Sequence, residues 1–194
     1  MKIVVATNNK GKVREIKDIL EGYEVVSQSE LGIDIDAEET GTTFAENALI
    51  KAKAIQEFVK DCAIIADDSG LVVDALGGDP GLYSSRYAGD GSTPDQCIDK
   101  LLENLKNVPD SQRDAYFISV IALIMPDGQE YTFEGRCNGS IAHERHGLGG
   151  FGYDPVFYIK EHKKTFSELG DNVKNTLSHR YVALVKLKEF LNTL

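Results

Sequence analysis

The sequence predicts an α/β protein with a mixed central sheet flanked by helices. Apolar runs alternate with segments of helical periodicity in the first half of the chain, and two long extended segments joined by a turn follow. Alternation of strands and helices favours parallel strands, whereas a late hairpin adds antiparallel ones. The sheet is therefore expected to contain both kinds of pairing.

The N-terminal segment predicts a strand, a loop and a helix. The apolar run from Ile3 to Ala6 indicates the strand, and the polar segment from Thr7 to Lys12 indicates the loop. The residues that then recur at helical spacing are Val13, Ile16 and Leu20. An acidic, non-periodic stretch at 31–41 is expected to be a loop.

Two further helices have clear start signals. Thr43-x-x-Glu46 is a capping box, in which each side chain satisfies a backbone N–H group at the helix start. The apolar face of this helix consists of Phe44, Ala48, Ala52, Ile55 and Val59. The next helix begins with Thr93 as its cap and Pro94 at its first position.

Between these two helices, an apolar run stops at two adjacent carboxylates. Residues 63–66 predict a strand, Asp67 to Gly70 predicts a turn, and 71–73 predicts a second short strand. The Gly-rich segment 77–91 is expected to be a loop.

The second half of the chain predicts a hairpin and a closing helix. The extended segments 115–125 and 130–137 are joined by a Pro-Asp-Gly-Gln turn. Residues 155–159 indicate another strand, and the last helix is expected to end near Leu191.

Composition favours one globular domain, residues 1–194, because 42% of the residues are hydrophobic and no linker interrupts them. A net charge of −10 argues against nucleic acid as a partner. Neither a signal peptide nor a membrane span is expected. Three cysteines without CxxC spacing favour a reduced, cytoplasmic protein.

Basic residues nevertheless gather at the start of the chain, at Lys10, Lys12, Arg14 and Lys17. A Gly-containing turn before a helix offers backbone N–H groups to an anion, and lysines add charge there. The segment lacks the GxxxxGK[ST] pattern of a P-loop. On this stretch alone, a phosphate site and an ordinary solvated turn remain equally open.

A second Gly-rich segment, 147–152, matches GxGxxG, but no strand precedes it and no helix follows it. We therefore reject a dinucleotide-binding site. The residues after it, Phe151, Tyr153 and Asp154, could instead stack on a base and form hydrogen bonds with it. His143 and His146 lie in an expected loop rather than on a zinc-binding helix.

The adjacent Asp67 and Asp68 allow two interpretations. Neighbouring side chains of a strand point to opposite faces, so the two carboxylates are expected to have different partners. Either both form the turn, or one supports the turn and the other binds a hard cation such as Mg²⁺. Glu38 and Glu39 could supply a second carboxylate.

Seven motifs, in this order along the chain, resemble those of the inosine/xanthosine triphosphate pyrophosphatases. They are Thr7-Asn8-Asn9-Lys10-Gly11-Lys12, Glu38-Glu39-Thr40-Gly41, Phe44-x-Glu46-Asn47-Ala48-x-x-Lys51-Ala52, Ala66-Asp67-Asp68-Ser69-Gly70-Leu71, Gly78-x-Pro80-Gly81-x-Tyr83-Ser84-x-Arg86-Tyr87, Gly149-Gly150-Phe151-Gly152-Tyr153-Asp154-Pro155 and Ser178-His179-Arg180.

The resemblance implies an elongated α/β fold of two lobes with a cleft between them. It also implies a Mg²⁺-dependent homodimer that hydrolyses ITP, dITP and XTP to the monophosphate and pyrophosphate. Its substrate is thus a small nucleotide, with neither nucleic acid nor membrane as a partner.

The resemblance also assigns roles to single residues. Glu39 and Asp68 would hold Mg²⁺, and Asp68 would accept the proton of the attacking water. The substrate contacts would be Thr7, Asn8, Asn9, Lys10, Gly11, Lys12, Ser69, Phe151, Gly152, Tyr153, Asp154, Lys174, His179 and Arg180. The neighbours of Lys174 depart from the family pattern.

Two expectations follow from this assignment. Asp67 would support the turn while Asp68 faces the metal. Arg180 would donate to the 6-keto oxygen of the base, so that ATP, with its amino group there, leaves polar groups unpaired.

Overall fold

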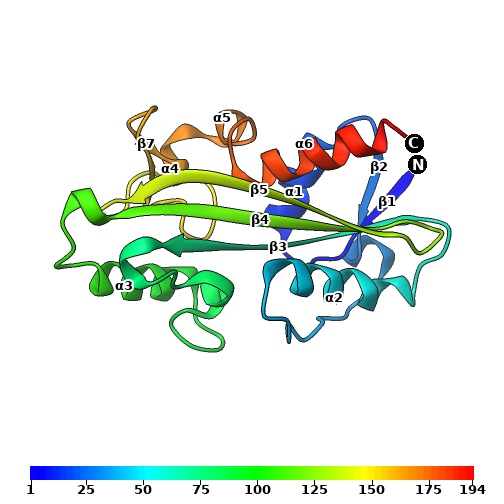
Figure 1. The fold of residues 1–194 in the computed structure, drawn as a ribbon, viewed down its shortest axis with the longest axis horizontal. Helices are drawn as coiled ribbons and strands as arrows, with labels where there is room; N and C mark the ends of the chain where they lie inside the picture. Colours follow the sequence, from blue (N-terminus) through cyan, green and yellow to red (C-terminus); the bar gives the residue numbers. More distant parts are fainter. The chain divides into compact units, whose positions relative to one another are not determined.

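The computed structural model describes residues 1–194, and one seven-stranded sheet runs through it in the order β2-β1-β3-β4-β5-β6-β7 (Figure 1). The strands are β1 (Lys2–Val5), β2 (Glu24–Ser27), β3 (Ala63–Val73), β4 (Asp114–Ile124), β5 (Glu130–Ile141), β6 (Phe157–Ile159) and β7 (Lys164–Thr165). The helices are α1 (Lys10–Ile19), α2 (Phe44–Gln56), α3 (Pro94–Asn104), α4 (Phe166–Leu169), α5 (Asp171–Lys174) and α6 (His179–Leu191).

Strand pairing confirms the mixed sheet. β1 is parallel to both β2 and β3, whereas β6 is antiparallel to both β5 and β7. No helix is long and apolar enough to cross a membrane.

The chain divides into two compact units. Unit 1 comprises Met1–Asp68, Ser119–Gly135 and His179–Leu194, and unit 2 comprises Ser69–Ile118 and Arg136–Ser178. The long strands β3, β4 and β5 contribute residues to both units. The cleft expected between two lobes stays a prediction.

In unit 1, helices cover both faces of the sheet (Figure 1). Ile3, Ile65 and other odd-numbered strand residues pack against the apolar residues of α1 and α6. Even-numbered ones, among them Val4 and Ala66, pack against α2. This alternation is the two-residue period of a strand, and it sets which helix each later residue of β3 meets.

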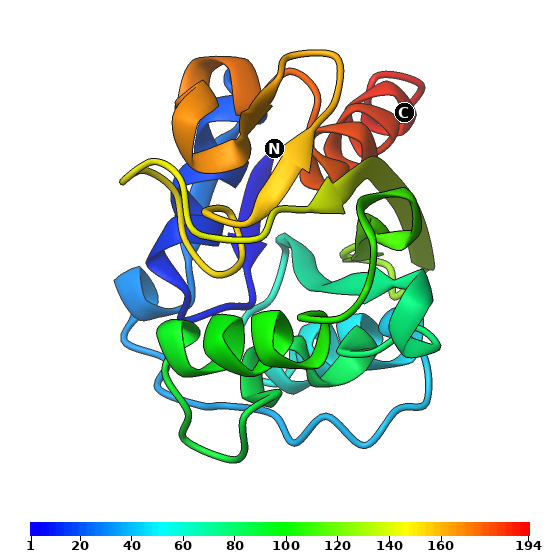
Figure 2. The same ribbon diagram turned by 90° about the vertical axis from the view of Figure 1, so that its left-hand side faces the viewer.

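Unit 2 has its own apolar core, in which Leu71 and Val73 of β3 pack with Ile98 and Leu101 of α3. Phe117, Phe157 and Phe166 form an aromatic cluster within it, with ring centroids 4.6 to 5.9 Å apart. Figure 2 shows α3 in green below the strands and the β6–α4 segment in yellow and orange above them.

The turn expected at Asp67 to Gly70 is wrong, because β3 continues without a break from Ala63 to Val73. The two buried carboxylates do not end the strand because side chains on each face of the sheet pair with them, as described below. The two predicted short strands are thus one strand of 11 residues.

Most of the other predicted elements are present. The predicted capping box of Thr43 with Glu46 forms, and the predicted cap Thr93 forms a capping box with Gln96. The expected strand at 155–159 is shorter, Phe157–Ile159, and α1 begins at Lys10, within the expected loop. The sequence did not reveal β2, β7, α4 and α5, which are all four residues long or shorter.

Candidate functional site

The alternation of β3 separates Asp67 from Asp68. Asp67 continues the series of Ala63 and Ile65, which faces α1 and α6. Asp68 continues the series of Ile64 and Ala66, which faces α2. The expectation that the two carboxylates have different partners is therefore confirmed, although the strand itself, rather than a turn, separates them.

Asp67 lies in the interior of unit 1 and is 1% exposed. Its Oδ2 atom accepts from Arg180 Nε at 2.9 Å and Nη2 at 2.7 Å, and lies 3.1 Å from Lys12 Nζ. Ser119 Oγ donates to Oδ1 at 2.6 Å. Burial would raise the pKa of Asp67, but Arg180 and Lys12 outweigh it and hold the pKa below its usual value.

Arg180 comes from the first turn of α6, and Nη1 of its guanidinium also pairs with the Glu15 carboxylate of α1. Burial would lower the pKa of Arg180, but Asp67 and Glu15 raise it. Arg180 is only 1% exposed. The contact of Arg180 with a base therefore stays a prediction. In the structure, Arg180 is the centre of a buried cluster of ion pairs.

Sequence reasoning missed Glu15. Glu15 precedes the apolar Ile16 in α1, and a charged residue of a helix is ordinarily expected on its solvent-exposed face. The available signal was its spacing from Lys12, because residues three apart lie on one side of a helix.

On the α2 face, Lys51 joins two carboxylates. Its Nζ atom lies 2.6 Å from Asp68 Oδ1 and 3.0 Å from Glu39 Oε1. Burial raises the pKa of Asp68 in spite of Lys51. Burial alone would lower the pKa of Lys51, but Asp68 and Glu39 together raise it.

This pair of carboxylates fits a hard cation. Glu39 and Asp68 direct oxygen atoms at one positive charge, the Lys51 ammonium, and oxygen donors suit Mg²⁺. No cluster of three or more His, Cys, Asp or Glu side chains suited to a metal ion occurs. Two carboxylates suffice for Mg²⁺ when phosphates and waters complete its coordination.

The N-terminal loop is shorter than expected, because Asn9 ends it by capping α1. Asn9 Oδ1 accepts from Lys12 N at 3.1 Å, and Thr7 Oγ1 accepts from Asn9 N at 3.2 Å. Lys10 and Gly11 thus belong to the first helical turn, where free backbone N–H groups favour an anion. Asn8 is exposed and donates to Ile35 O at 3.3 Å.

A second group of predicted substrate residues forms a cluster in unit 2. Lys174 Nζ lies 2.6 Å from Asp154 Oδ2 and 4.5 Å from the centre of the Phe151 ring. The same Asp154 oxygen accepts from Phe151 N at 2.9 Å. Gly150 permits this approach, since a Cβ atom there would lie 2.1 Å from Asp154 Oδ2.

The remaining predicted residues have different surroundings. Tyr153 is buried in the core of unit 2, and its hydroxyl donates to Ser84 O at 2.7 Å. Burial raises its pKa. Gly152 adopts a positive φ of 58°, Ser69 is half-buried in β3, and His179 is buried at the start of α6.

We expect Tyr153→Phe to destabilise the protein by about 1–2 kcal/mol, because it leaves the buried Ser84 carbonyl without this donor. Urea unfolding measures the change. Tyr131→Phe is the matched control, since it removes a hydroxyl from an exposed contact with Gln129 and should cost less than about 0.5 kcal/mol. Equal losses for the two variants would contradict the structural role of Tyr153.

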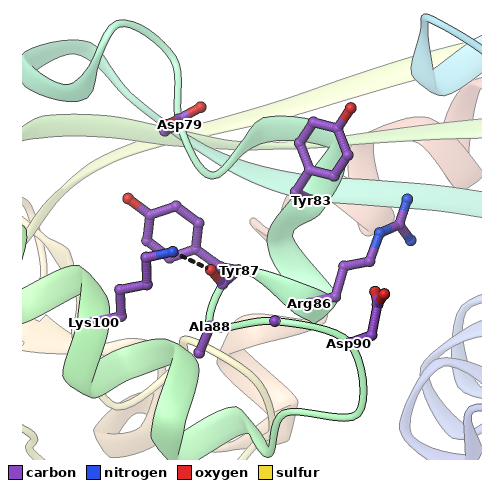
Figure 3. A pocket seen from close by; sticks show the side chains of 8 residues that line it. Asp79, Tyr83, Arg86, Tyr87, Ala88, Asp90 and Lys100 are labelled. Carbon is purple, nitrogen blue, oxygen red and sulfur yellow. Dashed lines mark hydrogen bonds between the residues drawn. The ribbon is translucent and has the colours of Figure 1, made fainter.

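A surface pocket of ≈ 580 Å³ lies elsewhere in unit 2 (Figure 3). Its lining residues are Asp79, Tyr83, Arg86, Tyr87, Ala88, Gly89, Asp90 and Lys100. Lys100 Nζ donates to Tyr87 O at 2.6 Å and lies over the Tyr87 ring. The lining mixes two carboxylates with two cations and includes none of the predicted site residues.

Comparison with known proteins gives concordant matches over the whole chain. The model of the Ham1 family matches residues 3–190. A dITP/XTP pyrophosphatase of Desulforamulus reducens is 51% identical over 196 residues, which cover 100% of this chain and 97% of that relative.

Two solved structures are also similar. The Staphylococcus aureus Ham1 protein has a TM-score of 0.87 at 44% identity and covers 100% of this chain and 99% of its own. A HAM1 protein from Coxiella burnetii has a TM-score of 0.88 at 41% identity and covers 100% of both chains.

Proposed function

Since this chain belongs to the Ham1 family, we propose that it is a nucleoside-triphosphate pyrophosphatase for deaminated purine nucleotides. The substrates would be ITP, dITP and XTP, and the products the monophosphate and pyrophosphate. The observation that carries the proposal is the convergence of Asp68 and Glu39 on the Lys51 ammonium, in the same unit as the capped start of α1 with its lysines. Relatives about half identical to this chain bear the name dITP/XTP pyrophosphatase.

In the proposed reaction, water attacks the α-phosphorus and the bond to the bridging oxygen of pyrophosphate breaks. Positioning and neutralisation of phosphate charge supply most of the catalysis in such reactions. The backbone N–H groups of the first turn of α1 and the Lys12 ammonium would bind the triphosphate. Asp68 would orient the water and accept its proton, a role that its raised pKa supports.

Glu39 and Asp68 would hold Mg²⁺. When bound, this ion would neutralise charge on the phosphate oxygens and help to orient the triphosphate. Lys51 lies between the two carboxylates, so its ammonium would have to turn toward another anion, and the phosphates are suited to receive it.

The cluster in unit 2 supports selection of the base. Phe151 offers a ring for stacking, Lys174 a donor and Asp154 an acceptor. Hypoxanthine and xanthine present an O6 acceptor and an N1–H donor, the complement of this pair, whereas adenine reverses both. A polar mismatch of this kind gives discrimination of order ~10⁴.

The resemblance also leads us to propose a homodimer that works in the cytoplasm. Three free cysteines are consistent with a reducing compartment. The mass in solution, measured by light scattering, tests the dimer.

The direct test is pyrophosphate release from a panel of ITP, dITP, XTP, GTP and ATP, with Mg²⁺ and with EDTA. We expect release from the first three nucleotides, at least about 10²-fold slower release from ATP, and none with EDTA. Equal turnover of ATP and ITP, or release of orthophosphate alone, would overturn the proposal. The alternative is a pyrophosphatase whose substrate carries a different base. A panel extended to modified pyrimidine nucleotides distinguishes this alternative from the proposal.

A further inference from the structure

Glu15 is a buried charge for which the proposed reaction has no use. Its side chain is 2% exposed and pairs with Arg180, which pairs with Asp67, which in turn holds Lys12. Lys12 and Glu15 lie three residues apart on α1, so one helix carries both ends of this series of four charges that alternate in sign, called the charge ring below.

The charges of this ring cancel, since Lys12 and Arg180 are positive and Glu15 and Asp67 are negative. Burial lowers the pKa of Lys12, the Asp67 carboxylate raises it, and the nearby Arg180 guanidinium lowers it because the two cations repel each other. Without the charge of Glu15, the four groups would carry one excess positive charge. That excess would favour departure of a cation from the ring.

Lys12 is the cation that can leave. Its side chain is 15% exposed, against 1% for Arg180. It also stands in the first turn of α1, where the backbone N–H groups favour an anion.

We infer that Glu15 is a positioning residue for Lys12: by neutralising Arg180 it lets Asp67 hold the Lys12 ammonium, and so sets how readily Lys12 leaves for a phosphate. This inference rests on the proposed function, in which Lys12 contacts the triphosphate. Loss of the Glu15 charge should therefore tighten anion binding, whereas structural damage to the site would weaken it.

Calorimetric titration of the whole protein with inorganic tripolyphosphate, without metal, tests the inference. Glu15→Gln preserves the shape of the side chain and is expected to tighten tripolyphosphate binding about three- to tenfold, which lies within the couplings found between neighbouring residues. In a Lys12→Met background the same change should alter the affinity by less than about twofold.

Asp18→Asn is the matched control, because it removes an equal charge from the exposed side of the same helix. It should change the affinity by less than about twofold. Weaker or unchanged binding by Glu15→Gln, an undiminished effect with Lys12→Met, or an equal effect of Asp18→Asn would each overturn the inference.

Ser119→Ala provides a second test that removes no charge and remains available if Glu15→Gln does not fold. Asp67 then loses a donor and should hold Lys12 more firmly, so tripolyphosphate binding should weaken about twofold, and only when Lys12 is present. Persistence of that loss in the Lys12→Met background would also overturn the inference. Pyrophosphate release from ITP by the unaltered protein is a separate measurement. It distinguishes failure of the proposed function from failure of the inference about Glu15.

Discussion

Asp68→Asn is expected to slow hydrolysis of ITP by about 10²- to 10⁴-fold while leaving a folded protein, because it removes the proposed proton acceptor and one of the two metal-binding carboxylates. Single-turnover release of pyrophosphate at saturating ITP measures the chemical step.

Folding should survive this change. Burial raises the pKa of Asp68 despite the pairing with Lys51, so ionisation of this carboxyl opposes folding. A neutral side chain of the same shape should therefore change the free energy of unfolding by less than about 1 kcal/mol. A variant that hydrolyses ITP at the unaltered rate would remove Asp68 from the reaction, and a large loss of stability would contradict the account of its burial.

Asp67→Asn, one residue earlier, is expected to destabilise the protein by about 3–5 kcal/mol, the effect of removing one partner from a buried ion pair. Arg180 and Lys12 would both lose a carboxylate that now lies 2.7 Å and 3.1 Å away. Urea unfolding at neutral pH measures the change, with Asp68→Asn as the matched control at the next position.

The comparison is sharp because the two substitutions are chemically identical and adjacent. Asp67→Asn should cost far more stability than Asp68→Asn, since the low pKa of Asp67 shows that its charge favours folding. Similar losses for the two variants would contradict the division of roles between the faces of β3.

Much of the fold followed from local patterns in the sequence. Capping residues such as Thr43 and Thr93 act within one helical turn, and apolar periodicity reports the buried face of each helix. The continuity of β3 could not be predicted this way. It depends on Arg180, which lies 113 residues from Asp67 in the sequence and neutralises a charge that otherwise signals a turn.

The candidate site likewise contains residues that local motifs predict and residues whose partners lie far away in the sequence. Motifs identify Asp68 and Glu39, and both carboxylates approach the Lys51 ammonium, while their shared role in binding a metal stays a prediction. For Glu15 the only local signal is its helical spacing from Lys12. Ser119 could not be found, because nothing near a hydroxyl side chain among apolar residues indicates its distant partner, Asp67. The predicted substrate contact of Tyr153 stays a prediction, and its hydroxyl donates to Ser84 O, a contact that only the fold creates.

The unbroken course of β3 also limits how the proposed reaction centre can adjust. A carboxylate in a turn could follow its substrate by small rotations of the backbone, but the backbone of a paired strand cannot move without breaking ladder hydrogen bonds. The backbone at Asp68 is therefore held in place by the sheet. Adjustment to nucleotides of different shape has to come from groups around it, above all the loop that bears Glu39 and the long, rotatable side chain of Lys51.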